Sequence, residues 1–132
     1  MAYVIDATAL EALACRNQKA MRVIGRAIET GKCYITPPTV ATAYYAIWER
    51  EGEVAAERWL EYATSGSVMK LENRQDREFL RLVAMSRTIT KLPLCSRYAA
   101  ALAKSLDAVV ITNLSNFEDL AKAKFCRVSW IG

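Results

Sequence analysis

The sequence predicts an α/β fold in which helices cover both faces of a parallel sheet of about five short strands, giving three α/β/α layers. One observation is that short runs rich in β-branched and aromatic residues alternate with helical patterns along all 132 residues. Another is the stretch Leu94–Phe117, which joins an alanine-rich helix to an apolar strand and then to a polar loop, as in half of a β-α-β unit. We expect residues 1–132 to form one domain.

The expected strands are short and apolar, and they are Ala2–Ile5, Cys33–Thr36, Ser67–Leu71, Ala108–Thr112 and Arg127–Ile131. The expected helices are one with a Thr8–Glu11 capping box, then Asn17–Thr30, Pro38–Arg50, Glu53–Ala63, one capped near Asp76, and the alanine-rich helix after Leu94. A second capping box, Ser115 and Glu118, is expected to open a last short helix. Apolar residues at helical spacing, among them Trp48 and Met85, are expected to face the core.

Composition excludes several kinds of site. The chain has no histidine, so it cannot build a Ser-His-Asp triad, a Cys-His pair or a His-ligated metal. Its four cysteines are scattered without a C-x-x-C pair, which disfavours structural zinc and predicts buried thiols, while a disulfide stays open. The net charge of +4 gives weak support to a polyanionic partner.

Neither a membrane span nor a secretory signal is predicted. Charged residues interrupt every apolar run before it reaches the roughly 18 residues that a bilayer span needs. Asp6 also interrupts the apolar start of the chain, and no basic segment precedes it. We therefore expect a cytoplasmic protein without a membrane partner.

A crevice is expected where the first and fourth strands end. Right-handed crossovers would place these strands side by side, so that Asp6 and the loop from Thr112 to Asn116 share one edge of the sheet. Neither a G-x-G-x-x-G nor a G-x-x-x-x-G-K motif is present, which leaves carboxylates as the chemistry to look for. Carboxylate clusters hold Mg²⁺ or Mn²⁺ in enzymes that hydrolyse phosphodiesters.

The chain resembles the PIN domains, especially the small VapC-like ribonuclease toxins. The resemblance extends over nearly the whole chain and rests on the order of five segments: Val4–Thr8, Thr36–Pro38, Tyr98–Ala103, Val110–Thr112 and Asn116–Phe117. It implies a PIN fold and Mg²⁺- or Mn²⁺-dependent endoribonuclease chemistry by acids at fixed places.

Only one of the four principal acids of that family is present. The first corresponds to Asp6, the candidate metal ligand and catalytic remnant, and the hydroxyl residue two positions later corresponds to Thr8. The other three places hold Ala43 (or Thr42), Ser96 and Leu114, while Asn116 stands where an acid or amide precedes the phenylalanine. The structural alternatives are that Ser96 and Asp6 act as helix caps.

Three functional hypotheses follow. The first is a VapC-like protein whose nuclease site is degenerate, with no cofactor, which binds RNA or protein. The alternative is an active Mg²⁺- or Mn²⁺-dependent endoribonuclease toxin of a toxin–antitoxin pair, using Asp6, Asn116 and a relocated acid. The third is RNA binding without cleavage by a basic stripe along the second helix, made of Arg16, Lys19, Arg22 and Arg26, for which a solvated helix face is the structural alternative.

The resemblance also implies partners. PIN domains form dimers, and the segment Pro38–Ala63 is crowded with large aromatic side chains, so we expect a homodimer through this helical hairpin. An antitoxin-like protein is the second partner that the resemblance implies.

Overall fold

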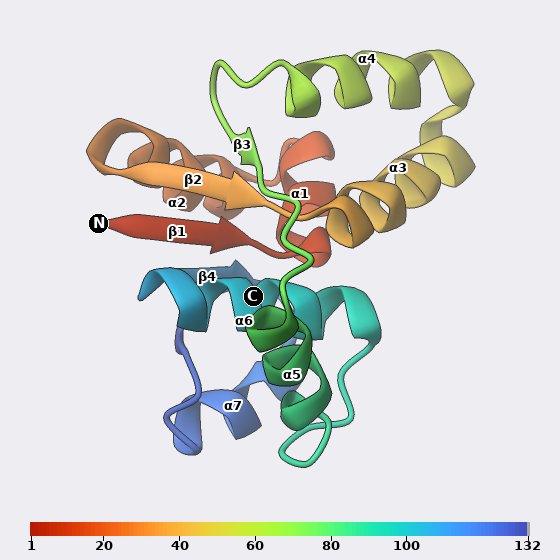
Figure 1. Ribbon diagram of the computed structural model, residues 1–132. Helices are drawn as coiled ribbons and strands as arrows, with labels where there is room; N and C mark the ends of the chain where they lie inside the picture. Colours follow the sequence, from red (N-terminus) through yellow and green to blue (C-terminus); the bar gives the residue numbers. More distant parts are fainter. Residues whose placement is uncertain (132) are drawn as a thin grey trace.

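The computed structural model describes residues 1–131, in which strands and helices alternate along the chain (Figure 1). The strands are β1 (Ala2–Ile5), β2 (Lys32–Ile35), β3 (Lys70–Leu71), β4 (Val109–Thr112) and β5 (Arg127–Trp130). The helices are α1 (Ala7–Ala14), α2 (Gln18–Thr30), α3 (Pro37–Glu51), α4 (Glu53–Thr64), α5 (Arg77–Ser86), α6 (Leu94–Leu106) and α7 (Glu118–Lys122), with a 3-10 turn η1 (Ser115–Phe117). The predicted fold class, a three-layer α/β/α arrangement with a parallel sheet, is confirmed.

The sheet places the first and fourth strands next to each other. Its order is β3-β2-β1-β4-β5, and every neighbouring pair is parallel. Ile5 pairs with Ile111, and the N–H of Asp6 donates to the carbonyl of Ile111 at 2.9 Å. Asp6 and Thr112 are the next residues along their strands, so the predicted crevice lies at the carboxyl end of β1 and β4.

Two cores form because successive strand residues point to opposite faces of the sheet. Ile5 and Ile111 belong to the core under α1 to α4, whereas Val4 and Val110 belong to the core under α5, α6 and α7. All four are fully buried. The alternation fixes the register, because a slip of one residue would turn each apolar side chain to the wrong face.

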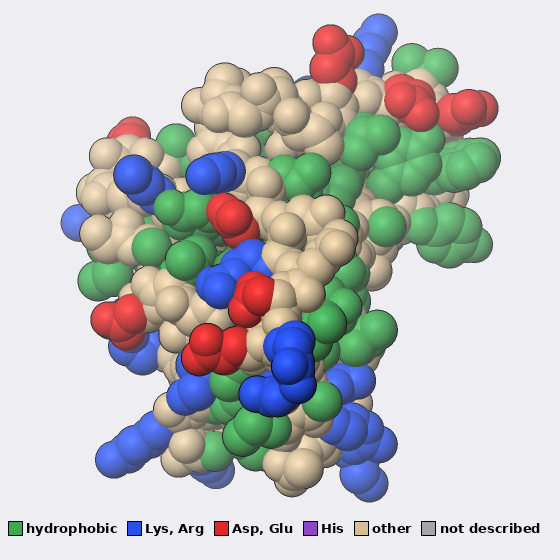
Figure 2. Space-filling view, in the orientation of Figure 1, with side chains coloured by type: hydrophobic (Ala, Val, Ile, Leu, Met, Phe, Trp, Pro, Cys, Tyr) green, Lys and Arg blue, Asp and Glu red, His purple; other side chains and the backbone are tan. Residues whose placement is uncertain are grey.

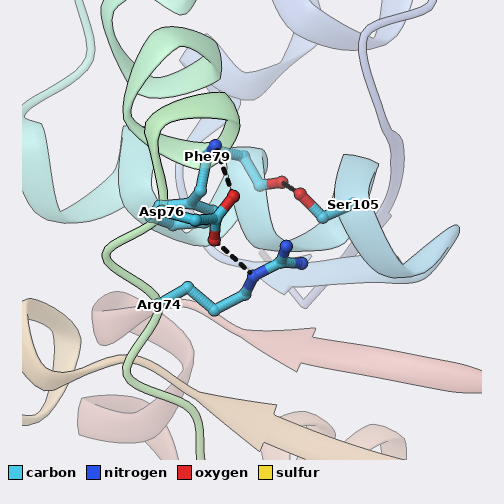
Figure 3. A network of polar contacts seen from close by, with 5 residues as sticks. Arg74, Asp76, Phe79 and Ser105 are labelled. Carbon is cyan, nitrogen blue, oxygen red and sulfur yellow. Dashed lines mark hydrogen bonds and ion pairs between the residues drawn. The ribbon is translucent and has the colours of Figure 1, made fainter.

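Side-chain caps start several helices where the sequence predicts them. Asn17 accepts from the N–H of Ala20 at 3.0 Å at the start of α2. At α5, Asp76 accepts from the N–H of Phe79 at 3.2 Å and from Arg74 at 3.2 Å, as Figure 3 shows. The bond from the Phe79 N–H holds the pKa of Asp76 below its ordinary value. These caps satisfy N–H groups that a first helical turn leaves unpaired.

The helices α3 and α4 form a hairpin that extends from the sheet (Figure 1). Gly52 joins them at φ 93°, a left-handed conformation that favours glycine. Hydrophobic side chains gather over the region where the two helices meet (Figure 2). Tyr45 and Trp48 on α3 and Val54 on α4 are all exposed. The expectation that Trp48 faces the core is therefore wrong: it lies one position beyond the fully packed Ile47, where no further layer covers the helix.

Three other expectations need correction. The third strand is limited to Lys70–Leu71, and both residues are exposed, because β3 is a sheet edge that pairs on one side with β2. Met85 is 57% exposed on α5. All four cysteines are free, and Cys15 is exposed rather than buried.

No helix in the described chain is both long and apolar enough to cross a membrane.

Candidate functional site

Asp6 is the centre of a buried polar cluster built from three hydroxyl groups. Its Oδ1 accepts from Ser96 Oγ at 3.0 Å, and its Oδ2 accepts from Thr112 Oγ1 at 2.9 Å and from Thr8 Oγ1 at 3.1 Å. Asp6, Ser96 and Thr112 are each at most 1% exposed. The cluster therefore joins β1, α1, α6 and β4 around one carboxylate.

The hydroxyls of this cluster are themselves connected to the loop after β4. Thr8 Oγ1 accepts from the N–H of Asn113 at 3.0 Å, and Thr112 Oγ1 accepts from the N–H of Leu114 at 3.0 Å. A hydroxyl has one donor and two acceptor sites, so each threonine can serve the carboxylate and the backbone together. The loop is thus fixed from inside the protein.

Burial has the largest effect on the pKa of Asp6. Desolvation raises the pKa of Asp6 above its ordinary value, and the hydrogen bonds from Thr112, Ser96 and Thr8 oppose this rise. Burial also raises the pKa of Cys33 and of Cys126 to about 11, so both thiols are uncharged near neutral pH. A thiol in that state is a poor metal ligand and nucleophile.

The capping roles expected around this site are absent. Asp6 stands at the N-cap of α1 but makes no side-chain cap hydrogen bond, and Thr8 bonds to Asp6 and Asn113 instead of closing a box with Glu11. Glu11 pairs with Arg50 at 3.0 Å. The expected capping roles of Asp6, of Thr8 with Glu11 and of Ser96 are wrong. The Asp6 carboxylate and the hydroxyls of Thr8 and Ser96 hydrogen-bond to one another instead of to the N–H groups of a helix.

The other predicted site residues do not add a carboxylate to the cluster. Ala43 is fully buried in the core under α1 to α4, and Thr42 Oγ1 donates to the carbonyl of Pro38. Leu114 packs against the core under α5 to α7. Asn116 is exposed in η1. Asp6 is accordingly the carboxylate around which the predicted residues come together.

These residues do not fit a Mg²⁺ or Mn²⁺ ion. Such ions need several oxygen ligands, usually including more than one carboxylate. Across residues 1–131, no group of three or more His, Cys, Asp or Glu side chains is placed to hold a metal. Both oxygens of Asp6 already accept hydroxyl hydrogen bonds.

The predicted basic stripe lies away from this cluster. Arg16 precedes α2 in a left-handed turn at φ 60°, while Lys19, Arg22 and Arg26 are exposed along the helix. α2 packs against α1 and β2, whereas the hydroxyl partners of Asp6 come from α1, α6 and β4. The stripe is thus an exposed surface of α2, whereas Asp6 is fully buried.

A pocket next to the cluster is lined partly by the predicted loop from Thr112 to Asn116, whereas its other two residues, Glu118 and Trp130, were not predicted to belong to a site. It is a hollow of about 300 Å³, lined by Asn113, Ser115, Glu118 and Trp130. On the same turn, a second hollow of about 410 Å³ is lined by residues that include Arg87, Lys91, Asn116 and Asp119. In the sequence, the signal for the first pocket was a tryptophan, Trp130, near the end of a predicted strand. The structure pairs Trp130 with Thr112 across β4 and β5.

Comparison with solved structures identifies the fold. No protein-family model and no curated protein sequence matches this chain. Structures that match it include VapBC2 from Rickettsia felis bound to a promoter DNA fragment, with 12% identity over 98% of both chains and a TM-score of 0.75. The Mycobacterium tuberculosis toxin VapC20, which cleaves the sarcin-ricin loop, matches with 10% identity over 91% of this chain and 94% of its own, at a TM-score of 0.73.

A further match is PAE2754 from Pyrobaculum aerophilum, which is 28% identical over 97% of this chain and 92% of its own, at a TM-score of 0.59. The chain therefore has the fold of the VapC-like PIN domains, as its sequence resemblance predicts.

Proposed function

We propose that this chain is a PIN domain similar to VapC toxins that has lost metal-dependent ribonuclease activity and binds RNA without cleaving it. The observation that carries the proposal is the saturated Asp6 carboxylate, which has three hydroxyl donors and no neighbouring acid from the other places where PIN domains carry one. An ion that replaced these donors would have to be dehydrated against a single negative charge, which is unfavourable.

A Mn²⁺ titration tests this proposal. The wild-type chain should show no saturable Mn²⁺ binding by calorimetry and no cleavage of a structured RNA. A Ser96→Asp, Leu114→Asp double variant, which restores acids at two of the places where PIN domains carry them, should bind Mn²⁺ measurably. Cleavage by the wild type that Asp6→Asn abolishes would overturn the proposal and establish the alternative, an active endoribonuclease toxin.

RNA binding is supported by the exposed cations. Arg22 and Arg26 lie one helical turn apart on α2, and both side chains reach solvent. If they contact phosphates, the affinity for RNA should fall steeply with salt, and the Arg22→Glu, Arg26→Glu variant should bind more weakly with a smaller salt slope. Salt-insensitive binding would contradict this part of the proposal.

A protein partner is the second part of the proposal. The exposed apolar side chains of Tyr45, Trp48 and Val54 are suited to self-association, because large apolar patches are uncommon on monomers. We expect a homodimer by sedimentation at micromolar concentration, and Trp48→Glu should shift it to monomer. An antitoxin-like partner is supported by the solved VapBC complexes from Rickettsia felis and Salmonella typhimurium, both described with DNA bound.

A further inference from the structure

The pocket next to the Asp6 cluster has one aromatic wall and three polar side chains. Trp130 is 37% exposed at the end of β5, and its strand is held in place because the N–H of Ile131 donates to the carbonyl of Thr112 at 3.0 Å. Asn113 is fixed from the other side by its backbone bond to Thr8. The backbone on both sides of the hollow is therefore held by hydrogen bonds to neighbouring segments.

The polar side chains of this pocket are available because the predicted capping box does not form. Neither η1 nor α7 has a side-chain cap hydrogen bond, so the prediction that Ser115 and Glu118 cap this segment is wrong. Glu118 Oε1 contacts Lys122 Nζ at 3.2 Å, but both side chains are more than half exposed. Such a surface pair is weak because water screens it, and the carboxylate can exchange partners.

This combination is suited to an unpaired nucleobase. Single-stranded RNA is recognised by stacking a base on an aromatic side chain and by hydrogen bonds to the edges of that base. The lining includes the indole of Trp130, the amide of Asn113 with donors and an acceptor, and the carboxylate of Glu118, which only accepts.

The carboxylate favours one base over the others. Guanine carries two adjacent donors on its Watson–Crick edge, the ring N–H and the exocyclic amine, which match the two oxygens of a carboxylate. Adenine and cytosine place a ring acceptor beside their amine, and uracil places a carbonyl on each side of its single N–H. A carboxylate at Glu118 would meet an acceptor in each of these three bases.

A second hollow provides a place for the adjoining phosphate. Along the turn, Ser115 and Glu118 face the base pocket, whereas Asn116 and Asp119 face the hollow that also holds Arg87 and Lys91. Two cations on a polar surface are suited to an RNA phosphate group. Residues of one short turn, 115–119, thus contribute to the lining of both hollows.

We propose that the pocket of Asn113, Ser115, Glu118 and Trp130 binds an unpaired guanine of single-stranded RNA. The inference rests on the proposed function, RNA binding, and adds to it a base preference and a place on the molecule.

Titration with the four 5′-nucleoside monophosphates and with short single-stranded RNAs tests this inference. Guanosine monophosphate and G-containing RNA should quench tryptophan fluorescence saturably, and AMP, CMP and UMP should bind at least tenfold more weakly. Trp130→Ala should remove the quenching by guanine, whereas Leu71→Ala, which removes another exposed apolar side chain at the end of a strand, should retain it.

Glu118→Gln tests the carboxylate without depending on the Trp130 variant. It should weaken guanine binding at least tenfold, whereas Glu29→Gln, on the exposed surface of α2, should leave it unchanged. Tighter binding of the RNA than of the mononucleotide, lost in Arg87→Ala, would show that the phosphate hollow takes part.

The outcomes separate this inference from the proposed function. If RNA binds but all four bases compete equally, or if Glu118→Gln has no effect, the guanine pocket is refuted and RNA binding stands. If no RNA binds, the proposed function fails and the inference fails with it. If RNA is cleaved with guanine preference, the proposal of lost activity fails while the pocket is supported.

Discussion

Two polar clusters begin at adjacent residues, Thr112 and Asn113, yet they have opposite properties. In the cluster around Asp6, every hydroxyl and both carboxylate oxygens have a partner, and the central residues are buried. In the pocket around Trp130, the polar side chains are at the surface and Glu118 has only an exposed ion pair. Polar groups whose hydrogen bonds are complete inside the protein hold the fold together, whereas groups left incomplete at the surface can exchange water for a ligand.

The largest expected effect is on the free energy of unfolding, and it distinguishes the two clusters by substitutions at the adjacent residues Thr112 and Asn113. Thr112→Val keeps the shape of the side chain but removes one donor to Asp6 and the acceptor for the N–H of Leu114. We expect it to lower the free energy of unfolding by about 2–3 kcal/mol, because buried polar groups lose their partners. Asn113→Ala should change it by less than about 0.5 kcal/mol. Urea denaturation measures both, and equal effects would remove the distinction.

The pH dependence of stability should show the buried carboxylate. Burial raises the pKa of Asp6 in the folded state, so folding favours its protonated form. The contribution of Asp6 to stability is therefore fully present below its ordinary pKa of 3.8 and is lost as pH rises through the folded pKa. Relative to Asp6→Asn, the wild type should lose up to about 1.4 kcal/mol per pH unit within that window.

Urea denaturation of the wild type and Asp6→Asn at a series of pH values measures this difference. A difference that stays constant with pH would mean that Asp6 has the same pKa in the folded and unfolded chain. Asn17→Asp, which changes an amide to a carboxylate at an exposed cap, serves as a comparison, because an exposed acid should not follow the same pH course.

A smaller effect distinguishes a formed cap from an absent one. Asn17 caps α2 through the N–H of Ala20, so Asn17→Ala should lower the free energy of unfolding by about 1 kcal/mol. The loss of stability in Asn17→Ala can be compared with that of a substitution in the segment after β4, where the sequence pattern of a cap is present without its hydrogen bonds.

The smallest effect is expected at Ser115. Because no side-chain cap hydrogen bond forms at η1 or α7, Ser115→Ala should change the free energy of unfolding by less than about 0.3 kcal/mol. Thermal unfolding followed by circular dichroism measures it. A loss as large as that of Asn17→Ala would mean that Ser115 caps the segment in solution and is not available to a ligand.

Much of the fold follows from the sequence because it depends on local patterns. The strand Ala2–Ile5 was predicted with its observed bounds, and Asn17 was predicted at the start of its helix. The position of Asp6 beside the loop after Thr112 was also predictable, because crossover handedness and alternating helices define the strand order. The bounds of β3 were not, since only Lys70 and Leu71 of the predicted segment pair with β2.

The sequence by itself determined the parallel α/β arrangement, the strand ends that meet at Asp6 and the absence of acids at three expected places. Only the tertiary structure decided which groups hydrogen-bond to the remaining acid, Asp6. Ser96 lies ninety positions from Asp6 along the chain, and no local pattern says whether its hydroxyl caps a helix or donates to a distant carboxylate. A hydroxyl can rotate among several partners of similar energy, so the choice depends on which of them the fold buries beside it.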